Sequence, residues 1–146
     1  MTKDYPGGCA CGAVRFQCSA APLAMYNCHC RSCQLASGGA CAPLLVVPGQ
    51  ALRIAGHPKR HRPQRANGNH ATRLFCPECG TPLLALPDNN PAVVLVHAAA
   101  LDFPDGFKPV ADIWTVDALP WAHMDRHIPK MFKSPPILEP EDEVTL

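Results

Sequence analysis

The sequence has few charged and few aromatic residues, and it contains no long hydrophobic run. Of its 146 residues, 17% are charged and 6% are aromatic, whereas 47% are hydrophobic. This composition is typical of a globular chain and unlike that of a disordered one. No segment approaches the roughly 20 apolar residues of a membrane-spanning helix, and the N-terminal sequence MTKDYPGG lacks the apolar stretch of a signal peptide. We therefore expect a cytoplasmic protein with no membrane partner.

Acidic residues are absent between Asp4 and Glu78. Residues 1–77 carry nine basic side chains and one acidic one, and residues 78–146 carry four and eleven, so the two halves have net charges near +8 and −7. In a single domain such halves can simply attract each other. The other interpretation is a surface that attracts an anion, either a small carboxylated substrate or nucleic acid. The lack of aromatic residues among the basic ones argues against nucleic acid.

Proline is abundant and limits the length of regular elements. Seventeen prolines favour short strands and many loops, because proline interrupts helix interiors and central strands. We therefore expect one small, mainly β domain. The predicted strands are residues 12–18, 23–28, 40–48, 51–56, 81–86, 92–101 and 110–116. Residues 40–48 and 51–56 are expected to be buried, a short helix is expected at 31–39, and Asn67-Gly68 predicts a hairpin turn.

Cysteine is frequent, with nine residues. In a reducing compartment cysteines more often bind metals than form disulfides, and an odd number leaves at least one unpaired. Seven of them form three motifs, which are Cys9-x-Cys11, Cys28-x-Cys30-x-x-Cys33 and Cys76-x-x-Cys79. Cys-x-x-Cys followed by glycine is a strong zinc-binding signal, because the turn directs both thiols at one point. We expect Cys18 and Cys41 to behave as small buried hydrophobic residues.

The spacing of these motifs does not fix which cysteines share a metal ion. A structural zinc needs four ligands, so seven cysteines divide most simply into four and three. Cys30 and Cys33 could instead join Cys76 and Cys79 in a zinc ribbon. A group of three would leave one coordination position for water or a substrate, with Cys41 as the alternative fourth ligand.

The sequence closely resembles the glutathione-dependent formaldehyde-activating enzyme family, whose domain is shared with centromere protein V, in the ordered segments GGCACGAVRF, CHCRSCQLASG and RLFCPECGTPL. The segment LDFPDGFKPVADIWTVDALPW extends this resemblance towards residue 133. The resemblance implies one zinc-binding domain over residues 1–133, followed by an acidic, proline-rich tail at 134–146 that we expect to be partly disordered. It also implies a β-tent fold of small antiparallel sheets pinned by a structural zinc, with one short helical turn after the CHCxxC motif.

The resemblance further implies two zinc ions per chain. The residues implied to hold the structural zinc are Cys9, Cys11, Cys76 and Cys79. The residues implied to hold the catalytic zinc are Cys28, Cys30 and Cys33. His29 lies between two of these ligands, and we expect it to lie beside the site or to face solvent rather than to bind metal. Asp112 replaces a histidine that many relatives have before Ile-Trp, so no role of that histidine is expected in this chain.

The implied activity is that of a carbon–sulfur lyase similar to S-(hydroxymethyl)glutathione synthase. Such an enzyme adds a small thiol such as glutathione to formaldehyde or a related aldehyde, or cleaves the adduct. Three thiolates on Zn²⁺ give a net charge of −1, which suits the binding of a thiol as thiolate better than the activation of water. Arg60 and Arg62 are the candidates for binding substrate carboxylates. The alternatives are a non-catalytic zinc or thiol carrier and, less favoured, a zinc module that binds nucleic acid or protein.

Overall fold

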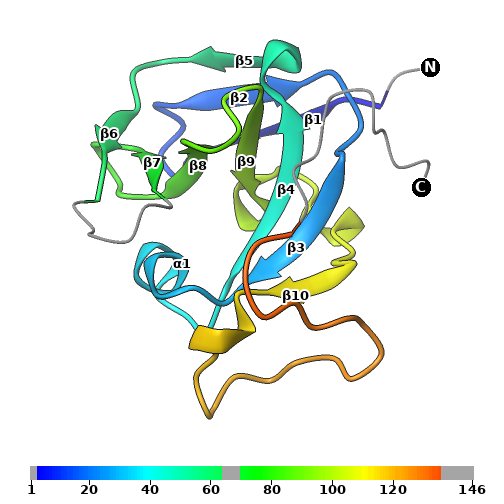
Figure 1. Cartoon of the computed structure of the whole chain (residues 1–146). Coiled ribbons are helices and arrows are strands. Elements are labelled where there is room, and N and C mark those ends of the chain that lie inside the picture. The colour runs from blue at the N-terminus through cyan, green and yellow to red at the C-terminus, as the bar shows by residue number, and fades with distance from the viewer. Residues whose placement is uncertain (1–2, 64–69, 136–146) are drawn as a thin grey trace.

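The protein is mainly β, with two sheets and a single α-helix in the part of the chain that the structure, a computed structural model, describes: residues 3–63 and 70–135 (Figure 1). The smaller sheet has the strand order β1 (Tyr5–Gly8), β2 (Arg15–Cys18) and β5 (Leu52–Ala55). The larger sheet has the order β10 (Ala111–Ile113), β3 (Ala24–Cys28), β4 (Ala42–Pro48), β9 (Val93–His97), β8 (Pro82–Pro87), β7 (Ala71–Phe75) and β6 (Lys59–His61). The helix α1 spans Arg31–Ser37, and short 3₁₀ turns lie at Gly49–Ala51, Ala98–Ala100, Pro104–Gly106 and Thr115–Asp117.

A first hydrophobic core lies between the two sheets. Exposure alternates along strand β2: Arg15 and Gln17 are exposed, whereas Phe16 and Cys18 are buried. These two side chains belong to one cluster with Leu45 and Val47 of β4 and Leu84 of β8. Burying a side chain of the size of leucine or phenylalanine contributes about 1.5–3 kcal/mol. This core therefore holds the smaller sheet against one face of the larger sheet.

A second core covers the opposite face of the larger sheet. Its members include Tyr26, Leu44 and Val46, together with Cys28 at the end of β3 and Cys33 in α1. Strand β4 contributes to both cores, which is why its sequence is a continuous apolar run rather than an alternating one. Two of the three cysteines of the CHCxxC motif thus lie in a packed interior beside α1.

The prediction of a mainly β fold with small sheets and one short helix is confirmed. The helix ends at Gly38, which has a left-handed backbone (φ 74°) and donates its N–H to the carbonyl of Gln34. Strand β10 pairs with β3 in parallel, which the expectation of antiparallel sheets did not include.

Several boundaries and environments differ from the prediction. Strand β5 is exposed over its last three residues, because it is an edge strand and not the buried strand expected at 51–56. The segment YPGG was missed as strand β1 because its proline and glycines favour a turn. The segments predicted at 92–101 and 110–116 stop earlier as strands and continue as 3₁₀ turns.

The hairpin predicted at Asn67-Gly68 has its turn outside the described residues, and so does most of the tail at 134–146. The two arms of that hairpin are described. Strands β6 and β7 pair antiparallel, with Arg60 opposite Leu74.

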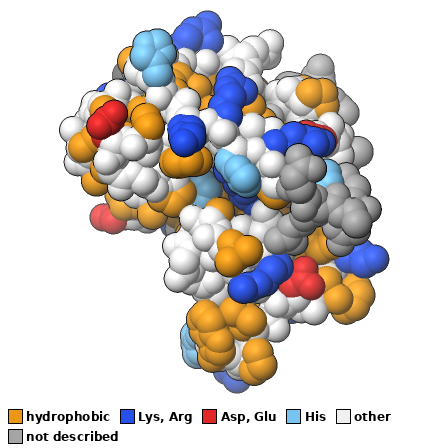
Figure 2. Space-filling model, turned by 90° about the vertical axis from the view of Figure 1, so that its left-hand side faces the viewer, with side chains coloured by type: hydrophobic (Ala, Val, Ile, Leu, Met, Phe, Trp, Pro, Cys, Tyr) orange, Lys and Arg blue, Asp and Glu red, His pale blue; other side chains and the backbone are white. Residues whose placement is uncertain are grey.

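The basic and the acidic halves of the chain meet in ion pairs. Arg15 contacts Asp102 at 2.5 Å and Arg62 contacts Asp88 at 2.5 Å, and each pair joins residues 1–77 to residues 78–146. Figure 2 shows basic side chains interspersed with hydrophobic ones on one face rather than gathered into one continuous patch. This arrangement favours the interpretation in which the two halves attract each other. Exposed pairs of this kind contribute little stability, about 0–1 kcal/mol each.

Within residues 3–63 and 70–135, no helix has the length and apolar character needed to cross a membrane.

Candidate metal centres

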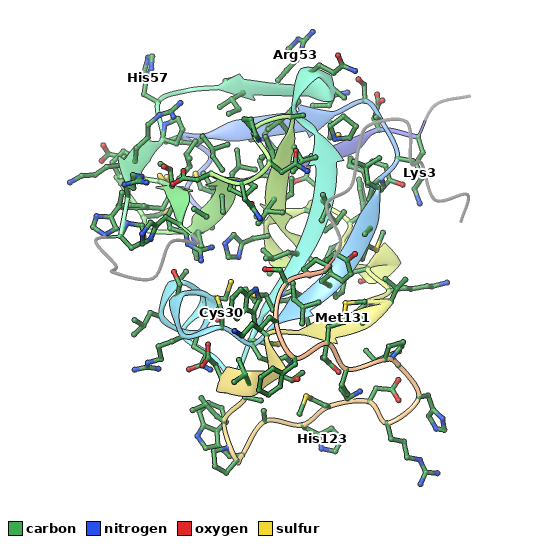
Figure 3. All side chains as sticks on the ribbon, in the orientation of Figure 1. Lys3, Cys30, Arg53, His57, His123 and Met131 are labelled. Carbon is green, nitrogen blue, oxygen red and sulfur yellow. The ribbon has the colours of Figure 1, made fainter. Side chains whose placement is uncertain are left out.

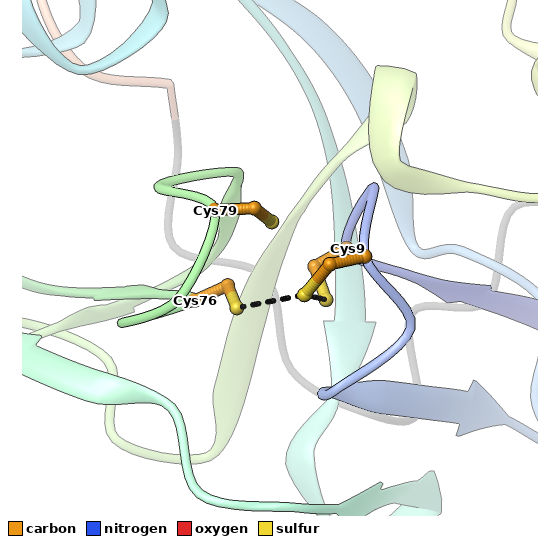
Figure 4. A group of neighbouring side chains, drawn as sticks. Cys9, Cys76 and Cys79 are labelled. Carbon is orange, nitrogen blue, oxygen red and sulfur yellow. Dashed lines mark hydrogen bonds between the residues drawn. The ribbon is translucent and has the colours of Figure 1, made fainter.

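The first and third cysteine motifs meet in space. The sulfur atoms of Cys9, Cys11, Cys76 and Cys79 all lie within 4.8 Å of one another. The Sγ atom of Cys11 is 3.6 Å from that of Cys9 and 3.7 Å from that of Cys76. Figure 4 shows the labelled thiols directed towards a common point. Sulfur ligands of a tetrahedral zinc with bonds of about 2.3 Å are separated by about 3.8 Å, so this group fits a zinc ion with only small shifts.

Two glycines shape the turns that carry these cysteines. Gly12 and Gly80 follow the two motifs and have φ angles of 81° and 75°. Their N–H groups donate to the carbonyls of Cys9 and Cys76 at 3.2 and 2.9 Å. Because a residue with a side chain rarely adopts such φ angles, glycine is what lets each chain segment turn back around its sulfur atoms.

Thr81 connects the two motifs, and its role could not be read from the cysteine spacing. Its hydroxyl accepts the N–H of Ala10 at 3.1 Å and lies 3.1 Å from the Sγ of Cys79. Hydrogen bonds from the hydroxyl and the N–H of Thr81 lower the pKa of Cys79 to about 5. The N–H of Val14 donates to the Sγ of Cys9 at 3.2 Å and in the same way lowers the pKa of that thiol. Backbone and hydroxyl donors thus favour the thiolate form that a metal requires.

The middle motif forms a second group of three thiols. The sulfur atoms of Cys28, Cys30 and Cys33 lie within 4.8 Å of one another. Cys28 ends β3, and Cys30 caps α1 by accepting the N–H of Cys33 at 3.3 Å. Figure 3 shows Cys30 beside α1, near the lower ends of β3 and β4. A helix begins at this point because the thiol of Cys30 replaces the usual oxygen at the helix N-cap.

Among the described residues, this second group contains three sulfur ligands and not four. Cys41, the alternative fourth ligand, is not part of the group. It lies after α1, where its carbonyl accepts the hydroxyl of Ser37 at 2.9 Å. The three thiols line a cavity of about 210 Å³. A metal ion held by them would therefore have a coordination position that faces the cavity.

Arg73 is the basic side chain at this second group. Its Nη2 donates to the hydroxyl of Ser32 at 3.0 Å and to the Sγ of Cys33 at 3.5 Å. Its Nε and Nη1 atoms are buried and have no hydrogen-bond partner among the described residues. Hydrogen bonds from Cys28 and Cys33 lower the pKa of Cys30, and the positive charge of Arg73 lowers it further. The guanidinium therefore favours negative charge on the sulfur atoms.

The two arginines selected from the sequence lie elsewhere. Arg60 is exposed on β6, and Arg62 pairs with Asp88. Neither lines the cavity, whereas Arg73 does. The only signal for Arg73 in the sequence is its place three residues before Cys76. That its side chain lines the cavity, as that of Ala71 does, is known from the structure alone. Carboxylate binding by Arg60 and Arg62 stays a prediction.

His29 is buried and lies against Asp112. It is 1% exposed, and its Nε2 lies 3.0 Å from Oδ1 of Asp112. The Nζ of Lys130 lies 3.0 Å from Oδ2 of the same carboxylate. Burial opposes ionisation of Asp112, but hydrogen bonds from His29 and Lys130 outweigh it and lower the pKa of this carboxyl. His29 thus lies beside the site and does not face solvent, and its not being a metal ligand stays a prediction.

The fold and the two thiol groups define a small β protein with two potential metal centres. The chain belongs to the glutathione-dependent formaldehyde-activating enzyme family, whose model matches residues 4–117. Its fold is also similar to the crystal structure of a protein from Rhodobacter sphaeroides, with a TM-score of 0.56 and 20% identity. That similarity covers 86% of this chain and 99% of the other chain, and at this identity it supports the fold alone. Membership in the family supports a role in formaldehyde activation that involves glutathione-type thiols.

Proposed function

We propose that this protein is a zinc-dependent carbon–sulfur lyase that joins a glutathione-like thiol to formaldehyde or a related aldehyde, or cleaves the adduct. The observation that carries the proposal is the group of three thiols at the wall of a cavity, with no fourth cysteine in the group among the described residues. In a chain of this family, an open ligand position beside a cavity is where a thiol substrate would bind.

The residues present fit two zinc ions with different roles. The group of Cys9, Cys11, Cys76 and Cys79 supplies four sulfur atoms and is closed, as in structural zinc sites. The group of three supplies a partial set and opens on the cavity. When bound to the three thiols, zinc supplies a position that holds a thiol substrate in its thiolate form.

The proposed reaction is a nucleophilic addition of the thiol sulfur to the carbonyl carbon of the aldehyde. The sulfur of the thiol forms a bond to the aldehyde carbon, and the thiol proton is transferred to the carbonyl oxygen, so no oxidant or reductant takes part. Arg73 stabilises negative charge at the sulfur group through its contact with Cys33. The buried pair of His29 and Asp112 fixes the backbone between Cys28 and Cys30. These residues orient the thiols and are not consumed in the step.

The decisive experiment measures zinc content and adduct formation together. The intact protein should bind two zinc ions, and the variant in which Cys28, Cys30 and Cys33 are all replaced by serine should bind one. The intact protein should accelerate the formation of S-(hydroxymethyl)glutathione from glutathione and formaldehyde, whereas the triple variant should not. One zinc ion in the intact protein, or equal adduct rates for the two proteins, would contradict the proposal.

A non-catalytic thiol carrier is the second candidate, because the same open group of thiols would also fit simple binding. It predicts that glutathione binds to the intact protein and that the adduct forms at the rate found without protein. Comparison of the two rates at equal glutathione concentration separates the carrier from the lyase.

A further inference from the structure

The cavity extends away from the three thiols along a continuous apolar wall. Strand pairing places Tyr26 opposite Leu44 in the first row of side chains beyond Cys28, and Val46 opposite Leu95 in the next row. Successive side chains on one face of a strand are about 6.6 Å apart, so the second row lies about 13 Å from Cys28. All five of these residues line the cavity. The wall is thus an apolar surface two rows deep that begins at the sulfur atoms.

The apolar lining continues beside Cys28 onto the end of β10, where Ile113 lies in register with Cys28. Ile113 and Trp114 line the cavity from the end of β10. Trp114 has a φ of 56°, which is unusual for a residue with a large side chain. Its N–H donates to the carbonyl of Lys133, and this contact keeps the segment in place. Backbone strain of this kind persists where the surrounding structure requires it, often at ligand sites.

The described residues that line the cavity include few charged side chains that could bind a substrate with several charges. Among its described lining residues, Arg73 is the only lysine or arginine, and it already contacts Ser32 and Cys33. His70 is the one histidine among these described lining residues, and its Nδ1 is buried without a hydrogen-bond partner among them. Asp117 also lines the cavity and would repel a carboxylate. Glutathione has two carboxylates and one ammonium group, whereas Arg73 is the only permanently charged cation among the described lining residues.

Formaldehyde is also too small to fill the cavity. A single water molecule needs about 10–15 Å³ of cavity volume, and this cavity measures about 210 Å³. An aldehyde with a single carbon would fill only a small part of this volume. A substrate that covers the wall gains up to about fourfold in binding for each methylene that it buries.

We propose that the preferred carbonyl substrate is an aldehyde with an apolar substituent, which lies along the wall formed by Tyr26, Leu44, Val46 and Leu95 while its carbonyl carbon meets the sulfur of the thiol. This inference rests on the proposed lyase function and adds the class of the aldehyde. The bond that forms joins sulfur to the aldehyde carbon, and the thiol proton moves to the carbonyl oxygen. The product is a hemithioacetal in which sulfur carries a 1-hydroxyalkyl group, and the reverse reaction releases the same aldehyde and the thiol.

The test uses the zinc-loaded full chain, glutathione and three aldehydes: formaldehyde, propanal and hexanal. For each aldehyde, kcat/KM for adduct formation is divided by the rate constant of the uncatalysed reaction, which removes the intrinsic difference in reactivity. The ratio should be larger for hexanal than for propanal by at least about eightfold, since three more methylenes are buried at twofold or more each. It should be smallest for formaldehyde.

A ratio that is largest for formaldehyde, or that does not change along the series, overturns the inference and leaves the lyase function standing. No acceleration with any of the three aldehydes overturns the lyase function and the inference with it.

A substitution in the wall provides a second test. Leu95→Gln keeps the size of a partly buried side chain but makes the second row polar, and it should lower the hexanal ratio several-fold more than the formaldehyde ratio. The matched control is Leu35→Gln on α1, where the side chain is 64% exposed and outside the cavity, and it should change neither ratio. Equal losses for both aldehydes in Leu95→Gln, with the zinc content and the unfolding temperature unchanged, would overturn the inference.

Discussion

The two thiol groups are both built from cysteine, but they differ in the sequence separation of their members and in their access to the cavity. One joins Cys11 to Cys76, which are 65 positions apart, and has two exposed members. The other comes from six consecutive positions, has two buried members and opens on a cavity. Closing a long loop stabilises the folded chain, whereas three ligands from one local segment stabilise little but leave a position free. The distance in sequence between ligands, and not their chemistry, thus separates the centre proposed to stabilise the fold from the centre proposed to bind substrate.

The largest expected effect is the loss of the four-thiol centre. Structural zinc in small peptides binds with about 10–16 kcal/mol, and the whole stability of a domain is about 5–15 kcal/mol. Cys76→Ser should therefore abolish cooperative thermal unfolding, and removal of zinc from the intact protein with a chelator should do the same. Circular dichroism during heating measures both. The control is Cys41→Ser, a cysteine outside both groups, which should unfold like the intact protein.

Substitution in the three-thiol group should leave the protein folded but remove its thiol binding and activity. Cys30→Ser should remain folded, because the four-thiol centre and the first core are untouched and a serine hydroxyl can still cap α1, but it should lose glutathione binding and adduct formation. Isothermal titration with glutathione and thermal unfolding measure the two properties on one sample. If Cys30→Ser unfolds as readily as Cys76→Ser, the division of roles between the two groups is wrong.

Arg73 tests the charge balance of the three-thiol group. Arg73→Met keeps a long side chain but removes the positive charge beside Cys33, and it should weaken glutathione binding about tenfold, since a hydrogen bond to a charged group contributes about 1.5–3 kcal/mol. Stability should be unchanged or higher, because two buried N–H groups without partners among the described residues are removed as well. Arg73→Lys should restore part of the binding.

The control for Arg73 is Arg53→Met, which should not change glutathione binding, because Figure 3 shows Arg53 at the top of the molecule, far from Cys30. A decrease in stability of Arg73→Met without any change in binding would assign Arg73 a structural role alone.

The smallest expected effect concerns the turn at the four-thiol centre. Gly80 has a φ of 75°, and a Cβ atom at this position would meet no atom within 4 Å, so Gly80→Ala costs only the backbone penalty, about 1–2 kcal/mol. Gly39→Ala is the matched control, because Gly39 has no positive φ and its nearest contact would be at 3.8 Å. Chemical denaturation should show a loss of stability for the first substitution only. Equal stabilities would mean that the turn does not constrain the centre.

Local features of the molecule were predictable, and contacts between distant residues were not. The helix at Arg31–Ser37 follows from residues that tolerate a helix and from the Gly38 stop, all within nine positions. Strand β5 was expected to be buried, and only its place at the edge of a sheet explains its exposure. Arg60 and Arg62 were selected over Arg73 because composition shows that a segment is basic but not which side chain faces the cavity.

The division of seven cysteines into four and three shows the same limit. The spacing of Cys-x-x-Cys and Cys-x-Cys follows from turn geometry, so each motif by itself predicts a pair of ligands. Spacing alone allowed Cys30 and Cys33 to share a metal with Cys76 and Cys79, and only the family resemblance favoured the other division. The structure brings Cys9 and Cys11 to Cys76 and Cys79 instead.

The amino-acid sequence by itself determined the short strands, the helix stop and the local cysteine motifs, because these depend on residues a few positions apart. The tertiary structure decided which motifs meet, that Arg73 contacts Cys33, that Thr81 bridges the four-thiol group, and that an apolar wall leads away from Cys28. The physical reason is that these contacts depend on strand register and on the packing of two sheets. Both are set by the balance of many distant contacts rather than by any one segment.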